Sequence, residues 1–285
     1  MSANPIPATD APRKPGMSRT QKLLFFITAW LICLMPFLFW WNTWFGRKLS
    51  DQQLTAYLHD AKKPRHIQQA LVQVGERITH HDANAPKYYP DLVRLAADPV
   101  EEVRNTDAWV MGQDTSGPEF HDTLLKLLSD PSQMVRGNAA LSLVRFGDAT
   151  GRPQILALLQ PAQIAAPESG HIIDSDRPGT AIHQGGLIAK LEYGQKQIAE
   201  IRSPIPGRIR SVAGTGTNLA SGAEVAVVDP ANDQVWEALR ALYLIGQPDD
   251  IPAIRSYERD LPDVSNDVRQ QALETEQAIR KRSGS

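Results

Sequence analysis

Two copies of one pattern lie in the middle of the chain: Ala166-Pro-Glu-Ser-Gly-His-Ile172 and Ser203-Pro-Ile-Pro-Gly-Arg-Ile209. The copies continue without a gap, and their proline, glycine and aliphatic positions coincide as far as Glu192 and Asp229. Such repetition predicts one structural unit per copy, each completing its core against the other. The spaced glycines suit turns with positive φ, and the runs that end each copy have strand composition. We therefore predict a small all-β domain over residues 162–230.

This layout resembles the biotinyl/lipoyl-type domain, a barrel-sandwich hybrid, and its second half resembles the half-motifs of periplasmic adaptor (membrane-fusion) proteins. Carrier members of that family attach their cofactor to a lysine at the tip of the hairpin that joins the halves. Counting from Glu192 puts Gln195 at that position and Lys196 one residue later. A shift of one residue in a strand reverses the face of the side chain. The resemblance therefore implies a domain without a cofactor. The alternative is a carrier domain with its cofactor attached to Lys196.

The composition limits the classes of function. The 285 residues suffice for about two domains. A net charge of −2 gives no reason to expect nucleic-acid binding. Cys33 is the sole cysteine of the sequence, so the chain cannot form an internal disulfide.

The N-terminal part predicts a membrane anchor. Residues 1–21 are rich in proline and small polar residues and are expected to be disordered. Residues 22–46 enclose an uncharged apolar run, and about 20 such residues cross a bilayer as a helix. A cleaved signal peptide is the competing interpretation, but the run is long and no cleavage motif follows it. Three tryptophans near its end suit a membrane interface, namely Trp40, Trp41 and Trp44.

Basic residues set the expected orientation of this helix. Arg13, Lys14, Arg19 and Lys22 precede the apolar run, which favours a cytoplasmic N-terminus. We therefore expect a single-pass protein of the cell inner membrane, with its C-terminal domains in the periplasm.

The remaining sequence carries a repeated helical signal. Asp98-Pro99, Asp130-Pro131 and Asp263 are each followed by a Val-Arg pair at a similar distance. Asp suits an N-cap and Pro the first helical turn, so each motif predicts a helix start. This element resembles the HEAT-type repeat family, including its relatives among the phycobilin lyases. The predicted fold is mainly α: a transmembrane helix and a HEAT-like α-solenoid (47–161 and 231–281) with the small β domain inserted between consecutive repeats, followed by a frayed tail over 282–285.

One position of each repeat holds an arginine, and one holds an aspartate. In stacked helix pairs such an arginine bonds a backbone carbonyl or the aspartate of the neighbouring repeat. This predicts a structural ladder along the stack, formed by Asp98, Arg104, Asp130, Arg136, Asp263 and Arg269.

Other polar clusters are weak candidates for chemistry. His80-His81-Asp82 could supply metal ligands, but no second ligand cluster accompanies it. Glu101-Glu102 and Asp249-Asp250 lie near predicted helix starts, where acidic residues favour the helix dipole. Motifs for a nucleophile or a phosphate-binding loop are absent from the sequence. We therefore predict no catalytic residues, no metal and no cofactor.

The sequence thus favours a non-enzymatic, membrane-anchored scaffold or adaptor. It would bind subunits of an envelope complex through the helical stack and the inserted β domain, without nucleic acid or a small-molecule substrate. One alternative is a carrier of lipoate or biotin on Lys196 that serves a membrane enzyme. The other is a tetrapyrrole lyase, implied only by the HEAT-type resemblance.

Overall fold

The computed structural model describes residues 18–44, 48–259 and 263–284, without the side chains of 33 and 36–44. The chain divides into two compact units, Met1–Leu49 and Ser50–Ser285. The predicted disorder at positions 1–17 falls outside the described residues.

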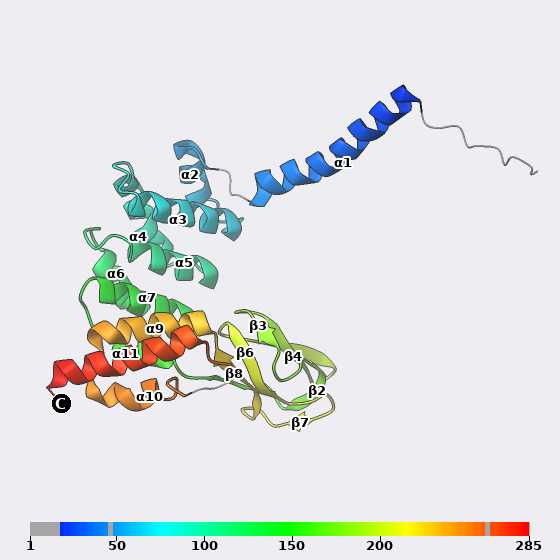
Figure 1. The fold of residues 1–285 in the computed structure, drawn as a ribbon. Helices are drawn as coiled ribbons and strands as arrows, with labels where there is room; N and C mark the ends of the chain where they lie inside the picture. The colour runs from blue at the N-terminus through cyan, green and yellow to red at the C-terminus, as the bar shows by residue number, and fades with distance from the viewer. Residues whose placement is uncertain (1–17, 45–47, 260–262, 285) are drawn as a thin grey trace, which may run out of the picture. The chain divides into compact units, whose positions relative to one another are not determined.

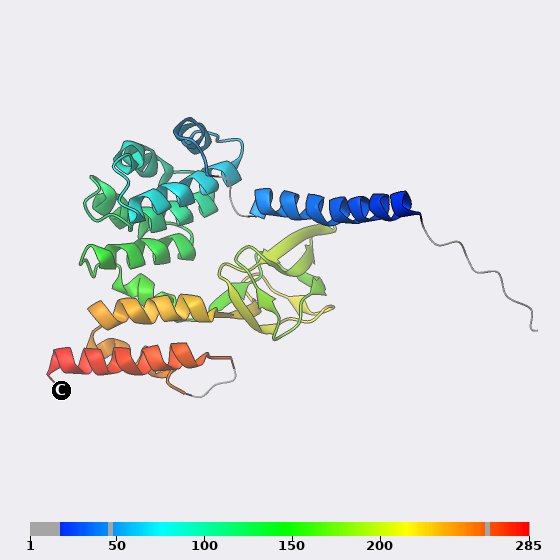
Figure 2. The ribbon, with the colours of Figure 1, turned by 45° about the horizontal axis from the view of Figure 1, so that its top comes forward.

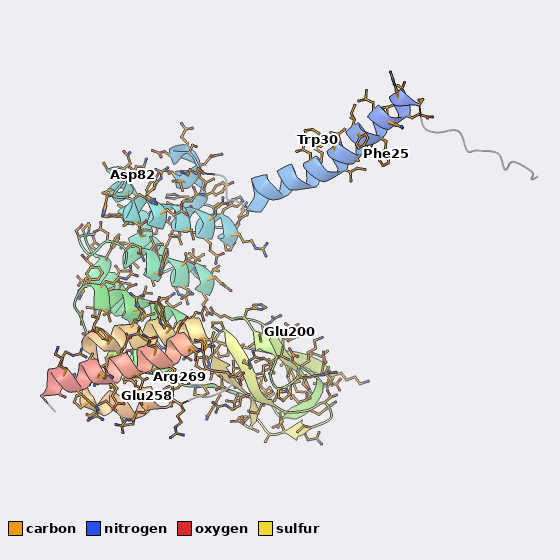
Figure 3. All side chains as sticks on the ribbon, in the orientation of Figure 1. Phe25, Trp30, Asp82, Glu200, Glu258 and Arg269 are labelled. Atoms are coloured by element: carbon orange, nitrogen blue, oxygen red, sulfur yellow. The ribbon has the colours of Figure 1, made fainter. Side chains whose placement is uncertain are left out.

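The first unit contains helix α1, which spans Arg19–Trp44. Its described apolar side chains run from Leu23 to Met35, and Phe25 and Trp30 are exposed on it (Figure 3). Within residues 18–44, 48–259 and 263–284, no helix is both long and apolar enough to cross a membrane.

The predicted transmembrane helix over 22–46 is therefore wrong, and the predicted fold class is corrected on this point. The predicted location in the inner membrane, with a cytoplasmic N-terminus and periplasmic C-terminal domains, is wrong for the same reason. The prediction rested only on the hydropathy of the sequence, counted over residues 22–46. The predicted interfacial residues Trp40, Trp41 and Trp44 lie outside the residues whose side chains are described.

The second unit contains helix pairs that stack in chain order (Figures 1 and 2). The first helices of the pairs form the A layer, which consists of α2 (Asp51–Leu58), α4 (Tyr89–Leu95), α6 (Phe120–Leu127), α8 (Arg152–Ala157) and α10 (Ile251–Arg255). The second helices form the B layer, which consists of α3 (Pro64–Thr79), α5 (Glu101–Met111), α7 (Gln133–Arg145), α9 (Asn232–Ile245) and α11 (Asn266–Ser283). The short 3-10 helices η1 (Ala85–Tyr88) and η2 (Pro248–Asp250) precede α4 and α10. Successive B helices pack on one another along the stack.

Apolar side chains at helical spacing hold the two layers together. Leu71, Leu92, Phe120, Leu143 and Leu239 are fully buried, and they come from both layers. Each helix pair buries its apolar stripe against the next pair, so the core is continuous along the stack.

The turn before α7 differs in detail from the sequence-based expectation. The N-cap of α7 is Ser132, whose hydroxyl accepts the backbone N–H of Val135. Asp130 acts earlier, because its carboxylate accepts the N–H of Ser132 at 2.8 Å. Asp98 accepts the N–H of Val100 in the same way. These aspartates therefore close the turn before the helix and do not cap it.

The β domain consists of two antiparallel four-stranded sheets. Its strands are β1 (Ala162–Ala165), β2 (Gly170–Ser175), β3 (Ala181–Ile182), β4 (Leu187–Tyr193), β5 (Gln197–Arg202), β6 (Gly207–Val212), β7 (Asn218–Leu219) and β8 (Glu224–Pro230). One sheet has the order β1-β8-β6-β3 and the other β5-β4-β2-β7. The two orders are equivalent: exchanging β1, β2, β3 and β4 with β5, β6, β7 and β8, respectively, turns the first order into the second. The two sequence copies are thus two interlocked halves of one core.

The β domain lies inside a helix pair. It joins α8 to α9, whereas the corresponding turns before α5 and α7 are the five-residue segments 96–100 and 128–132, which contain Asp98-Pro99 and Asp130-Pro131. Strand β1 pairs with β8, with Ala162 opposite Val228, so the entering and leaving chains run side by side. The sequence placed the insertion between consecutive repeats. The structure places it between the two helices of one repeat, at its internal turn.

The glycines shared by the two copies allow close backbone approach. A Cβ on Gly207 would overlap the carbonyl oxygen of Asp229, and a Cβ on Gly170 would overlap that of Glu192. We predict that Gly207→Ala lowers the free energy of unfolding by about 1–3 kcal/mol, because the β6–β8 pairing must shift. Gly214→Ala is the matched control, since no atom lies within 4 Å of its added Cβ. Equal urea denaturation midpoints for the two variants would contradict this account.

Candidate functional site

One pair among the predicted ladder residues connects neighbouring repeats directly. The Arg104 guanidinium holds the Asp130 carboxylate with two bonds, Nε to Oδ2 at 2.7 Å and Nη2 to Oδ1 at 3.0 Å. Its Nη1 donates to the carbonyl of Asp98 at 2.8 Å. Burial alone would raise the pKa of Asp130, but the hydrogen bonds from Arg104 and from the N–H of Ser132 lower it. The carboxylate is therefore ionised and paired inside the stack.

The other predicted ladder residues do not continue this arrangement. Arg136 donates to the carbonyls of Asp130 and Pro131. The next turn along the stack holds the β domain in place of an Asp-Pro sequence. Asp263 pairs instead with Arg208 of the β domain at 3.4 Å, and Arg269 donates to Asn266 at 3.0 Å.

The remaining candidates from the sequence have local roles. Lys196 lies in the β4–β5 turn with a φ of 61° and is exposed. His80 contacts the carbonyl of Glu76, and Asp82 accepts the N–H of Asn84. In the described part of the chain, no group of three or more His, Cys, Asp or Glu side chains is placed to hold a metal ion.

In each of the adjacent acidic pairs Glu101-Glu102 and Asp249-Asp250, one carboxylate links different elements. Glu101 accepts the hydroxyl of Ser132 at 2.6 Å and a bond from Gln184 of the β domain. Asp250 pairs with Arg152 at 2.7 Å. Glu101 thus connects α5, the start of α7 and the β domain.

Exposed apolar side chains gather on the B layer. Within the described helical stack, the large apolar residues that are exposed all belong to this layer, namely Val72, Trp109, Tyr243, Leu244 and Leu273. Trp109 and Leu244 line one hollow of this face, and Tyr243 and Leu244 line a second one. Helix periodicity did not reveal this face, because exposure here depends on how the pairs stack.

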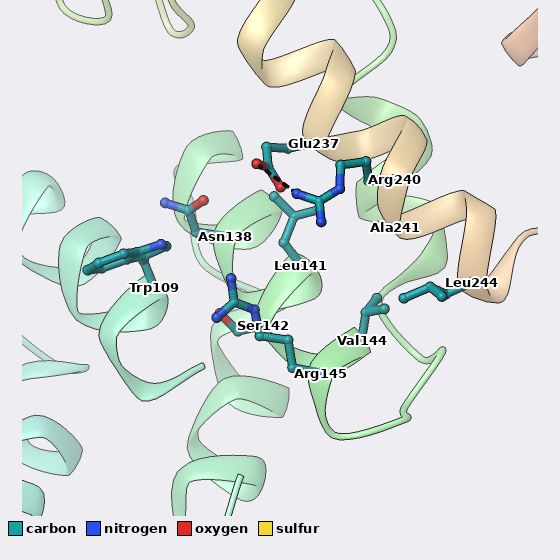
Figure 4. A pocket seen from close by; sticks show the side chains of 10 residues that line it. All are labelled: Trp109, Asn138, Leu141, Ser142, Val144, Arg145, Glu237, Arg240, Ala241 and Leu244. Carbon is teal, nitrogen blue, oxygen red and sulfur yellow. Dashed lines mark ion pairs between the residues drawn. The ribbon is translucent and has the colours of Figure 1, made fainter. Parts of the chain in front are cut away.

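A groove opens on this face between α5, α7 and α9. It has a volume of about 320 Å³. Its apolar lining includes Trp109, Leu141 and Leu244, and Arg145 and Arg240 add positive charge (Figure 4). The groove contains no pair of side chains arranged as a nucleophile and a base. Its chemistry is that of a binding surface.

Close helix packing fixes the aromatic wall of the groove. A Cβ on Gly75 of α3 would lie 3.1 Å from Cζ3 of Trp109, so the indole lies against the bare backbone there. The Ser142 hydroxyl donates to the carbonyl of Ala108 at 2.8 Å, which ties α7 to α5. Trp109 nevertheless remains 41% exposed, so it is both held in place and accessible.

A family model described as HEAT repeat matches residues 122–149, which contain most of α6 and all of α7. None of the curated proteins matches the chain. One solved structure, titled as that of a single-chain, multi-domain long-chain acyl-CoA carboxylase, shares 14% sequence identity at a TM-score of 0.24. The similar region covers 60% of this chain and 16% of that chain. At this TM-score the similarity carries no argument about activity.

These comparisons confirm the HEAT-type repeat at residues 122–149. The resemblance of the β domain to periplasmic adaptor proteins is not confirmed by them.

The Arg104–Asp130 pair is expected to be sensitive to loss of one partner. Arg104→Ala leaves the Asp130 carboxylate buried without its counter-ion, so the free energy of unfolding should fall by about 3–5 kcal/mol. Arg136→Ala is the control, because it removes only bonds to two carbonyls. Denaturant titration of both variants measures the difference, and losses of equal size would be inconsistent with the ion pair as described.

A second stability test concerns Asp107 of α5, which is fully buried. Neither of its carboxylate oxygens has a hydrogen-bond partner among the described residues. Burial raises the pKa of Asp107 well above its ordinary value. Its contribution to stability is therefore full below about pH 4 and is lost as the pH rises through the raised pKa.

Asp107→Asn removes this titration. We predict that the variant gains in melting temperature relative to the wild type as the pH rises from about 4 to about 8. The exposed Asp249→Asn is the control and should follow the wild-type profile. Parallel pH profiles for Asp107→Asn and wild type would show that Asp107 does not titrate differently in the folded state.

Proposed function

We propose that this chain is a non-enzymatic scaffold that docks a partner protein on its B layer. The observation that carries the proposal is that the exposed large apolar side chains of the described helical stack all lie on this layer, with Trp109 and Leu244 in one groove. HEAT repeats generally mediate contacts between proteins, and a HEAT repeat is present at residues 122–149. Stacked repeats offer extended surfaces suited to this purpose.

The groove has the composition of an interface centre. Tryptophan, tyrosine and arginine dominate the binding energy of protein interfaces. The groove is lined by Trp109, Arg145 and Arg240, and Tyr243 lines a second hollow that shares Arg240 and Leu244 with it. Because Trp109 is fixed against Gly75, it loses little conformational freedom when a partner covers it.

The β domain adds a second body, which polar contacts attach to the helical stack. Glu101 ties it to the starts of α5 and α7 through Gln184 and Ser132, and Arg208 pairs with Asp263 beside α11. The first of these contacts lies at the start of α5, and the second lies just before α11. We propose that the β domain offers a further docking surface held in a defined orientation to the groove.

Site-specific photocrosslinking in the native cell tests the proposal. p-Benzoylphenylalanine is placed at Leu244, which is 61% exposed beside the groove, and in a second strain at Asp122, which is exposed on the A layer. We expect irradiation to give a discrete protein adduct from position 244 and none from position 122.

A variant of the groove provides the control. Trp109→Ala should abolish the adduct from position 244, because it removes the central apolar contact. Ile198→Ala, which truncates an exposed side chain of β5, should leave that adduct intact. No adduct at position 244, or one that persists in Trp109→Ala, would refute docking in this groove.

A further inference from the structure

The groove contains a guanidinium whose hydrogen-bonding capacity is only partly used. Arg145 donates through Nη1 alone, to Gln113 Oε1 at 2.8 Å and to the carbonyl of Gly112 at 3.4 Å. Over the residues that the structure describes, Nε and Nη2 have no acceptor, and no carboxylate forms an ion pair with Arg145. A planar guanidinium presents five donors in a fork that matches a carboxylate.

Arg240, the second cation of the groove, already has partners within the protein. Arg240 pairs with Glu237 at 3.7 Å and its guanidinium lies 4.6 Å from the ring centroid of Trp236. The groove lining therefore holds two cations and one carboxylate, and that carboxylate is already matched. The charge left without a counterpart belongs to Arg145.

Apolar surface surrounds this charge. Figure 4 shows the Arg145 guanidinium pointing from α7 into the space between Trp109 and the α9 side of the groove. Leu141, Val144 and Leu244 complete the lining near it. An apolar anchor that fills the groove would remove water from the guanidinium, and a bidentate carboxylate is the group that compensates a cation there.

We infer that the partner segment docked in this groove places an Asp or Glu carboxylate, or a C-terminal carboxylate, beside a large apolar side chain, and that Arg145 receives the carboxylate. The inference rests on the proposed function and names the chemistry of the partner. A basic segment would meet two arginines at the groove, and an uncharged one would bury Arg145 without a counter-ion. Nucleic-acid phosphate would match the charge but not the apolar lining.

Selection of short random peptides displayed on phage, against the immobilised full chain, tests the inference. Peptides that also bind Trp109→Ala are discarded. We expect the remaining peptides to carry an Asp, a Glu or a free C-terminus close to a Leu, Phe or Trp. Affinities of the synthetic peptides are then measured by calorimetry.

Substitutions at position 145 separate charge recognition from structure. Arg145→Gln should weaken binding about tenfold or more, the size expected for a lost charged hydrogen bond. Arg145→Glu should reverse the preference, so that a peptide with Lys in place of its acid binds better than the original. Gln113→Ala removes the contact to Arg145 Nη1 but keeps the charge, and should leave the affinity unchanged. Arg202→Gln, at an exposed site of the β domain, should also have no effect.

The outcomes distinguish this inference from the proposed function. Peptides that depend on Trp109 but show no acidic preference, together with an unchanged affinity in Arg145→Gln, would overturn the inference and leave the docking groove standing. A selection that yields no peptide dependent on Trp109 would count against the groove itself. Competition by single-stranded nucleic acid at equal affinity would replace the peptide with a phosphate ligand.

Discussion

The antiparallel pairing of β1 with β8 is the constraint on which the arrangement of the second unit depends. Ala162 lies opposite Val228 and Ile164 opposite Ala226, so the chain leaves α8 and returns to α9 at one place. An insertion whose ends are adjacent disturbs its host little. The side chain of Gln234 then donates to the carbonyl of Leu158 at 2.9 Å, which fastens the start of α9 to the end of α8. Because of this closure, α9 packs on α7 as if the turn were short, and the groove between them can exist.

Closure at β1 and β8 depends in turn on the interlocking of the two halves. The N–H of Gly179 donates to Ile209 at 2.7 Å, and the N–H of Gly216 donates to Ile172 at 2.6 Å, so each half completes the other's sheet. Both glycines have a φ of 87°, which few other residues adopt. The helical stack gains stability pair by pair, whereas this domain requires both copies at once. The fold therefore joins a helical stack whose stability adds up repeat by repeat to a β domain that is stable only when both copies are present.

Local chemistry made some of this predictable from sequence. The repeated glycines around Gly170 and Gly207 report a backbone requirement that any sequence of this fold must meet, and the HEAT repeat at 122–149 shows as helical spacing. Tertiary context decided the rest. Asp130 closes a turn and pairs with Arg104 from the preceding repeat, which a cap rule applied to one helix misses. The apolar run of α1 was counted as a span, and the role of Trp109 appears only when neighbouring helices are in place.

Side-chain hydroxyls link two of the seams between successive B helices. The Ser142 hydroxyl bonds the carbonyl of Ala108 across the α5–α7 seam, and the Thr275 hydroxyl bonds that of Leu239 across the α9–α11 seam. Between α7 and α9, no side chain of α9 makes such a bond in the described structure, and Ala241 lines the groove there. This is the seam of the repeat that carries the β domain. No hydroxyl of the described side chains makes such a bond across the α3–α5 seam either, and the groove that exposes Trp109 and Arg145 opens beside α7 and α9. Departures from local regularity are expected at functional sites, and the groove borders the repeat whose internal turn the β domain interrupts.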